Sequence, residues 1–273
     1  MSLLLVLLAL ATASLGALGG LGGAVILVPL LVLTGTPARE AAPLGLLSVA
    51  SLSMAAGPRQ LAELTVHHRL GVTSETVAST GAVVGALLSG AVGDTVLTRL
   101  LAVAALAAAV ASLRGRDEAR AVTVDDGEGA GDLGERRGTL SGTFRADGVV
   151  RRYRARNLPG ALAVMSLAGF VAGIAGASGG FIKTPATTEI MRVPVKVAAA
   201  TTTFTTGITA AAALLVFAAH GRVDLEHAGP VIAGSLLGGH LGARFQATLD
   251  PDVIRRAMAA VLVAVAIVLF VGA

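Results

Sequence analysis

Two long blocks of the sequence carry almost no charge, and this pattern restricts the chain to folds that use a membrane as their solvent. The 273 residues are 54% hydrophobic and 14% charged, with a mean hydropathy of +0.80. Ten of the 21 Lys and Arg and eight of the 17 Asp and Glu lie between positions 114 and 157. The flanking blocks are apolar enough for several spanning helices. We therefore predict an all-α polytopic membrane protein embedded in a lipid bilayer.

Composition excludes several other classes of protein. The net charge is only +4 despite a pI near 10.6, and the basic residues are mixed with acids in one segment, so we expect no nucleic-acid partner. The chain has no Cys and only five His, so we expect no thiolate chemistry, no metal and no cofactor. The apolar run 2–18 lacks a basic start and continues into 24–33, so we interpret it as a retained membrane segment.

The chain contains two copies of one unit. Gly180 and Pro194 lie 157 residues after Gly23 and Pro37, without a gap. Three more glycines match at this offset, namely Gly16, Gly19 and Gly22 with Gly173, Gly176 and Gly179. Internal duplication is common in secondary transporters. The matches predict three parts, which are a first membrane repeat at 1–113, a charged cytoplasmic linker at 114–157 and a second membrane repeat at 158–273.

Each half is expected to hold four membrane segments, which gives about eight transmembrane segments in the chain. The apolar runs are 3–33, 41–62, 70–92 and 96–113 in the first half, and 160–190, 197–218, 228–248 and 254–272 in the second. The first run of each half is too long for one span of about 20 residues and is interrupted by glycines. We expect a broken helix or a re-entrant hairpin at that place.

That alternative decides the symmetry of the two repeats. A broken helix that crosses once gives parallel repeats, whereas a hairpin that returns gives an odd number of crossings and inverted repeats. With the linker in the cytoplasm, inverted repeats are favoured because they place four basic residues on that side: Arg192, Lys196, Arg255 and Arg256. Within the linker, alternation around residues 147–148 predicts a small β-hairpin, and a solvated tether is the alternative.

Two glycine-rich strings interrupt apolar helices at matching places and are candidate binding elements. A break inside a membrane is tolerated where the freed backbone lines a cavity, and the next helix begins with N–H groups that favour an anion. The alternative is close helix packing through small residues. The candidate substrate-binding residues of the breaks are Gly19, Gly22, Gly23, Gly176, Ser178, Gly179 and Gly180.

The order of these features resembles the TauE/SafE family of sulfite-exporter-like membrane proteins. The matching stretches are Gly19 to Pro37, Gly176 to Pro194, the small-residue segments 41–53 and 198–206, the turn 221–224 and the run 234–244. The resemblance covers both halves and leaves out the linker. It implies export of sulfite, sulfonates or related sulfur-containing organic anions, driven by the membrane potential or a proton gradient. The chain departs from the pattern at His67, which stands where the second half has Asp224, and in its longer linker.

Hydroxyl and charged side chains near the breaks complete the candidate site. The hydroxyls are Ser48, Ser51, Thr201, Thr202 and Thr205. They either replace the hydration shell of an oxyanion or bond to helix carbonyls. Lys183 either supplies a positive charge at membrane depth or extends to the interface. Arg59 is a candidate gate or an interfacial anchor, and His240 is a candidate proton carrier or a packing residue.

The favoured function is a secondary transporter that exports a small anion, most simply sulfite or an organosulfonate, by alternating access around the paired breaks. An anion channel is the alternative. A membrane-embedded enzyme is less favoured, because the sequence contains no HExxH motif, paired membrane Asp or Ser/His/Asp set. We expect a multi-pass protein of the inner (plasma) membrane, and the sequence leaves open whether it forms a homo-oligomer.

Overall fold

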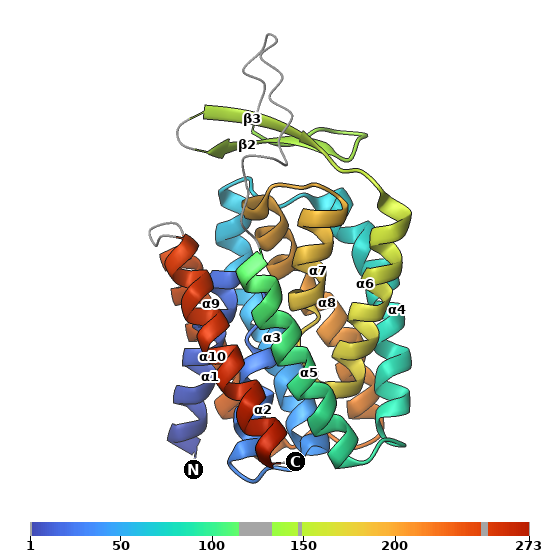
Figure 1. Ribbon diagram of the computed structural model, residues 1–273, viewed down its shortest axis with the longest axis vertical. Coiled ribbons are helices and arrows are strands. Elements are labelled where there is room, and N and C mark those ends of the chain that lie inside the picture. Colours follow the sequence, from blue (N-terminus) through green and yellow to red (C-terminus); the bar gives the residue numbers. More distant parts are fainter. Residues whose placement is uncertain (1, 115–132, 147–148, 247–250, 273) are drawn as a thin grey trace.

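The computed structural model describes residues 2–114, 133–146, 149–246 and 251–272, which form a bundle of helices with a small sheet at one end (Figure 1). The first half contains α1 (Ser2–Gly19), α2 (Ala24–Leu33), α3 (Ala38–Ala62), α4 (His68–Ser89) and α5 (Asp94–Arg114). The second half contains α6 (Leu158–Ala175), α7 (Gly180–Pro185), the π-helix η1 (Ala186–Ile190), α8 (Val195–Ala219), α9 (Leu225–Gln246) and α10 (Pro251–Gly272). Between them lie β1 (Gly134–Glu135), β2 (Ser141–Ala146) and β3 (Val149–Arg154).

The surface of the bundle suits a lipid environment. Within the described residues, α3, α6 and α8 are long and apolar enough to cross a membrane. Large apolar side chains on other helices face outward, and Leu4 and Leu87 are 58% and 56% exposed. Apolar surface spread over many helices indicates contact with lipid and not with water. The chain is therefore a helical membrane protein, as its hydropathy predicted.

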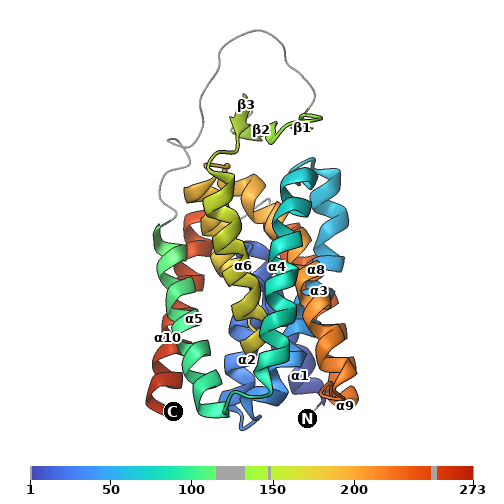
Figure 2. The same cartoon turned by 90° about the vertical axis from the view of Figure 1, so that its right-hand side faces the viewer.

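Each half begins with a helical hairpin that turns back inside the bundle. α2 returns alongside α1, with Gly23 against the backbone of Ala13, and α7 returns alongside α6, with Gly179 against Ala168. The hairpins enter from opposite ends: α1 begins at the end far from the sheet, whereas α6 begins and η1 ends beside the sheet (Figures 1 and 2). In both halves the first apolar segment is therefore broken at its glycines and doubles back inside the bundle.

Glycines let neighbouring helices pack backbone to backbone. α9 contacts α1 through Gly234, Gly238 and Gly242, and α4 contacts α6 through Gly81 and Gly85. A Cβ at any of these positions would overlap a carbonyl oxygen of the facing helix. Small-residue contacts of this kind are how membrane helices approach each other closely. They hold α4, which carries part of the site described below, firmly against α6.

A three-stranded antiparallel sheet in the order β1-β2-β3 covers the end of the bundle where α4 and α8 begin (Figure 2). Phe144 and Tyr153 point into the bundle and are only 7% and 4% exposed. They pack with Leu70 of α4 and with Met191, which follows η1. Apolar contacts therefore anchor the sheet on the helices. The turn predicted at 147–148 lies outside the described residues.

Candidate functional site

The two glycine breaks lie against each other in the interior of the bundle. The Ser178 hydroxyl donates to the Leu21 carbonyl and lies 3.2 Å from the Gly22 carbonyl oxygen. A Cβ on Gly180 would lie only 2.7 Å from the Leu21 carbonyl oxygen, so this approach requires glycine. Segments that are 157 residues apart in the sequence thus form one contact between the tips of the hairpins.

Glycine serves two purposes at the breaks. Gly22 and Gly176 have φ angles of +76° and +66°, which L residues rarely adopt. The second purpose is close packing. Gly23 packs against the backbone of its own hairpin, and a Cβ on Gly179 would lie 3.5 Å from the Lys183 Cε. Gly19 is the last residue of α1. Close packing therefore accounts for most contacts of the breaks, and the polar site begins one turn beyond the second one.

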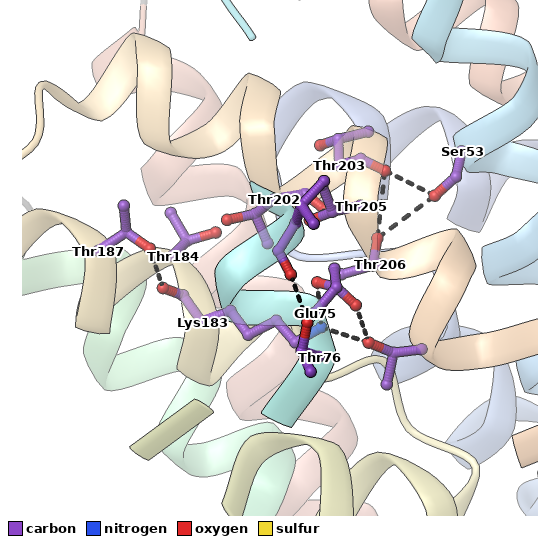
Figure 3. Close-up of polar contacts among 12 residues, drawn as sticks. Ser53, Glu75, Thr76, Lys183, Thr184, Thr187, Thr202, Thr203, Thr205 and Thr206 are labelled. Carbon is purple, nitrogen blue, oxygen red and sulfur yellow. Dashed lines mark hydrogen bonds and ion pairs between the residues drawn. The ribbon is translucent and has the colours of Figure 1, made fainter. Parts of the chain in front are cut away.

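Three side chains from three helices form a buried polar cluster beyond that break (Figure 3). Lys183 of α7 and Glu75 of α4 are 1% and 3% exposed, and their Nζ and Oε1 atoms are 2.7 Å apart. The Lys183 Nζ also donates to Thr209 Oγ1 of α8 at 2.6 Å, and the Thr209 hydroxyl donates to Glu75 Oε2. A buried ion pair needs such extra hydrogen bonds to offset the loss of hydration of both charges.

A pocket adjoins this cluster. Its cavity volume is about 10 Å³, which is room for about one water molecule. A Cβ on Gly71 of α4 would lie 2.7 Å from the Thr205 Cγ2 of α8, so these two helices meet closely at the pocket wall. The polar lining consists of one ion pair and several hydroxyls: Ser74, Glu75, Lys183, Thr187, Thr201, Thr202 and Thr205. The pocket thus combines one cation, paired with one carboxylate, with several neutral hydroxyls and apolar side chains.

Four residues that the sequence singled out meet at this pocket, namely Lys183, Thr201, Thr202 and Thr205. The lysine side chain points inward to Glu75 (Figure 3), and not to the membrane interface. The threonines lie on one side of α8 and face the lysine across the pocket. The structure therefore brings the predicted charge and the predicted hydroxyls together.

Four other predicted residues lie elsewhere. Ser48 Oγ accepts a hydrogen bond from Ser235 Oγ at 2.8 Å, between α3 and α9, and Ser51 is buried on α3. Arg59 is exposed near the end of α3, where it pairs with a glutamate four residues later at 3.0 Å. His240 is exposed on α9. Apart from the hydroxyl pair at Ser48, these positions do not contribute to a common polar site among the described residues.

Sequence reasoning did not assign roles to Glu75 and Thr209, although two signals point to them. Glu75 is the only acid between residues 64 and 93, and Lys183 is the only base between residues 157 and 191. Lone opposite charges in apolar helices are expected to pair. Thr209 continues the four-residue spacing of Thr201 and Thr205, which places all three hydroxyls on one face of α8.

The sheet lies over one end of the pocket. Leu70 both lines the pocket and packs with Tyr153 of β3, and the His67 backbone N–H donates to Thr201 Oγ1 at 2.9 Å. The His67 ring is fully buried in the α3–α4 connection, and its Nδ1 accepts the Leu70 N–H at 3.2 Å. Burial lowers the pKa of His67, against the opposing effect of the Glu135 carboxylate 3.6 Å away. Burial also raises the pKa of Tyr153.

Comparison with known proteins identifies the family of the chain. The family model described as "Sulfite exporter TauE/SafE" matches residues 5–269, which is nearly the whole chain. No curated protein and no solved structure matches the chain. The family is one of membrane transporters, and the matched range includes both hairpins, the pocket and the sheet. The chain therefore belongs to the TauE/SafE family of sulfite exporters.

Proposed function

We propose that the protein is a secondary transporter that exports a small anion, sulfite or an organosulfonate, through the inner membrane by alternating access. One observation carries the proposal: Lys183 is 1% exposed inside a bundle of apolar helices and lines a pocket that also contains several hydroxyls. A charge inside a membrane protein is costly, and such residues are characteristic of substrate and ion pathways. Neutral donors beside one cation suit an oxyanion that has left its hydration shell.

The arrangement of the helices supports an inverted repeat. Among the described residues, six helices have 21–25 residues, which are α3, α4, α5, α8, α9 and α10. The shorter α6, with 18 residues, is apolar enough to cross a membrane but is followed by α7, which turns back beside it. With one re-entrant hairpin each, the halves have three crossings and opposite orientations. The eight membrane segments expected from the sequence are then six crossing helices and two hairpins. This orientation keeps Arg192, Lys196 and the sheet on the cytoplasmic side, in agreement with the positive-inside rule.

The position of the pocket relative to the hairpin tips supports alternating access. The pocket lies between the sheet and the contact of Ser178 with Leu21, so the tip contact separates it from the opposite end of the bundle. Relative movement of the two repeats would open that contact while closing the helices at the sheet end. Transporters built from inverted repeats commonly move in this way around a site near the membrane centre.

Counterflow in proteoliposomes tests the proposal. Proteoliposomes that contain the purified protein are preloaded with unlabelled sulfite. They are expected to accumulate radiolabelled sulfite transiently against its concentration gradient, at a rate that saturates with sulfite concentration. A channel shows neither behaviour. The informative variant is the double change Lys183→Met with Glu75→Gln, because it removes both charges and leaves no buried charge unpaired. We expect at least a tenfold loss of uptake, equivalent to about 1.4 kcal/mol of binding free energy.

The matched control is Lys196→Ala, which removes an exposed lysine at the start of α8. It is expected to leave counterflow unchanged. Absence of counterflow across sulfite and a panel of short sulfonates would contradict the function, and full activity of the double variant would contradict the site.

A further inference from the structure

The buried charges of the pocket sum to zero, and this balance restricts what can enter. The lining contains one cation and one anion, Lys183 and Glu75, in direct contact at 2.7 Å. Both side chains are almost completely shielded from solvent. An anion that entered alone would leave one uncompensated negative charge in a region of low dielectric constant, where such a charge is strongly disfavoured. Binding of an anion therefore requires one compensating positive charge.

Glu75 is the group placed to take up that charge as a proton. α6, which packs against α4, contains no ionisable residue. On the other neighbouring elements, Glu189 of η1 and Lys196 of α8 are exposed. On α4 itself, the other ionisable side chains are the exposed residues 68–69 at its start, and His67 lies about two turns from Glu75. Among the described residues, the acid of the ion pair is thus the proton acceptor within the pocket.

We propose that Glu75 carries a proton with each substrate anion, so that the protein moves one monovalent oxyanion and one proton together without net charge. This inference rests on the proposed transport function and adds the ion to which anion transport is coupled. With Glu75 protonated, Lys183 keeps its positive charge and is released to the anion, and the loaded pocket is again neutral. When both ions leave, Lys183 and Glu75 re-form the ion pair, which neutralises the empty pocket.

Thr209 fits this exchange of partners. Its hydroxyl accepts from the Lys183 Nζ at 2.6 Å and donates to Glu75 Oε2. Two of the three N–H groups of the ammonium are used among the described residues, by Glu75 and Thr209, so a third is left for a ligand. Thr209 holds the two charged groups in place while Glu75 gives up its contact with Lys183, and it is a positioning residue.

The charge balance also restricts the charge of the substrate. A divalent anion would carry one charge too many for a site that supplies one cation and one proton, so sulfite would have to enter as monovalent hydrogensulfite. Neutral coupling makes net movement follow the combined gradients of anion and proton, independently of the membrane potential. An inward proton gradient opposes this co-export, so the anion leaves only when its outward concentration gradient exceeds the pH gradient.

The test measures protons and anions together. Proteoliposomes enclose a pH-sensitive dye, and the membrane potential is set with potassium and valinomycin. Methanesulfonate is the probe, because it keeps one negative charge over the whole working pH range and itself releases no proton. We expect a proton flux equal to the flux of radiolabelled methanesulfonate, and the same rate at positive, zero and negative potential.

Glu75→Gln separates the two fluxes. The neutral amide leaves Lys183 free for the anion, so exchange of labelled for unlabelled methanesulfonate continues while the proton flux is lost. Net uptake by the variant becomes sensitive to the membrane potential, since the anion now crosses without a proton. The matched control is Glu189→Gln, an exposed acid on η1, which keeps the wild-type proton flux. Should Glu75→Gln fail to fold, the stoichiometry and potential dependence of the wild-type protein decide alone.

The outcomes distinguish this inference from the proposed function. Wild-type anion flux without protons, flux that varies with potential, proton flux that persists in Glu75→Gln, or transport of sulfite with exclusion of methanesulfonate would each overturn proton coupling at Glu75 and leave the transport function standing. Absence of any anion flux would overturn both.

Discussion

The two re-entrant hairpins share a shape but not a chemistry. At the offset of 157 residues, the members of the polar cluster and their counterparts are Lys183 and Ile26, Glu75 and Ile232, and Thr209 and Leu52. All three counterparts are apolar, and Ile26 and Leu52 are 1% and 0% exposed. The polar cluster therefore exists at one of two related places, and its counterpart is packed as hydrophobic core.

This difference assigns separate tasks to the hairpins. The α6–α7 hairpin carries the buried lysine, whereas the α1–α2 hairpin contributes backbone. Its Gly20 carbonyl accepts a hydrogen bond from Thr184 at 2.9 Å, and its Leu21 carbonyl accepts one from Ser178. The first hairpin thus supports the second one at its tip. A single charged site avoids the cost of burying a second ion pair in the same bundle.

The largest loss of stability is expected from placing a lysine in the first hairpin at the position that corresponds to Lys183. In Ile26→Lys, an ammonium group replaces a side chain that is 1% exposed in the apolar core, with no acid at position 232 to receive it. Unpaired buried charges cost about 3–5 kcal/mol, so most of the folded protein should be lost. Size-exclusion chromatography and thermal unfolding in detergent measure this.

Adding Ile232→Glu to Ile26→Lys sharpens the same comparison. If positions 26 and 232 are related to the true cluster by the repeat, the new acid pairs with the new lysine and restores part of the melting temperature. The control is Leu225→Lys, at a position that is 83% exposed, which should melt like the wild type. Wild-type stability of Ile26→Lys alone would show that the first hairpin is not a dry core.

A smaller loss of stability is expected from a change in the contact between α4 and α6, which places Glu75 opposite Lys183. Gly169 of α6 faces α4, and a Cβ there would overlap the Ala78 carbonyl oxygen, whereas α1 carries Thr12 at the corresponding position. Gly169→Ala must push α4 away and should destabilise the protein by about 1–3 kcal/mol. Unfolding in detergent reports the loss, and anion counterflow reports the displaced Glu75.

Gly229→Ala of α9 is the matched control, because a Cβ there has no heavy atom within 4 Å. Alanine favours a helix over glycine by about 1 kcal/mol, so this variant should be as stable as the wild type or more so. Equal melting temperatures for both alanine variants would mean that α4 and α6 are not held by backbone contact.

The sequence could predict the positions of the hairpins and the lysine, but not the partner of the lysine. Glycine clusters and segment length locate the breaks, and a lone base in an apolar helix identifies Lys183 by its cost. The pairing with Glu75 depends on how α4 packs against α6 and α8, which no local pattern encodes. Arg59 and His240 illustrate the same limit. Membrane helices are apolar on both the lipid face and the inner face, so hydrophobicity does not distinguish an inward residue from an outward one.

The two hairpins also differ in their position relative to the sheet. The sheet lies over the end of the bundle where α6 begins and η1 ends, whereas α1 begins at the opposite end (Figure 2). We expect its docking to depend on His67, whose ring lies edge-on to the Tyr153 ring with 6.0 Å between the centroids and whose pKa is lowered by burial. Between the lowered pKa and the ordinary value of 6.5, the undocked state binds more protons. Docking is then fully stable above about pH 6.5 and weakens as the pH falls below that value.

Tyrosine fluorescence measures this smallest effect directly, because Tyr153 is the only tyrosine and the chain has no tryptophan. Acidification from pH 8 to 5 should change the Tyr153 emission as its buried ring meets water, while the helical circular dichroism stays constant. His67→Asn keeps a side-chain acceptor for the Leu70 N–H but does not titrate, so the transition should disappear. His240→Asn, at an exposed position on α9, should retain it. A pH transition that survives in His67→Asn would show that another group controls docking, and the sheet would then cover the second hairpin without sensing pH through His67.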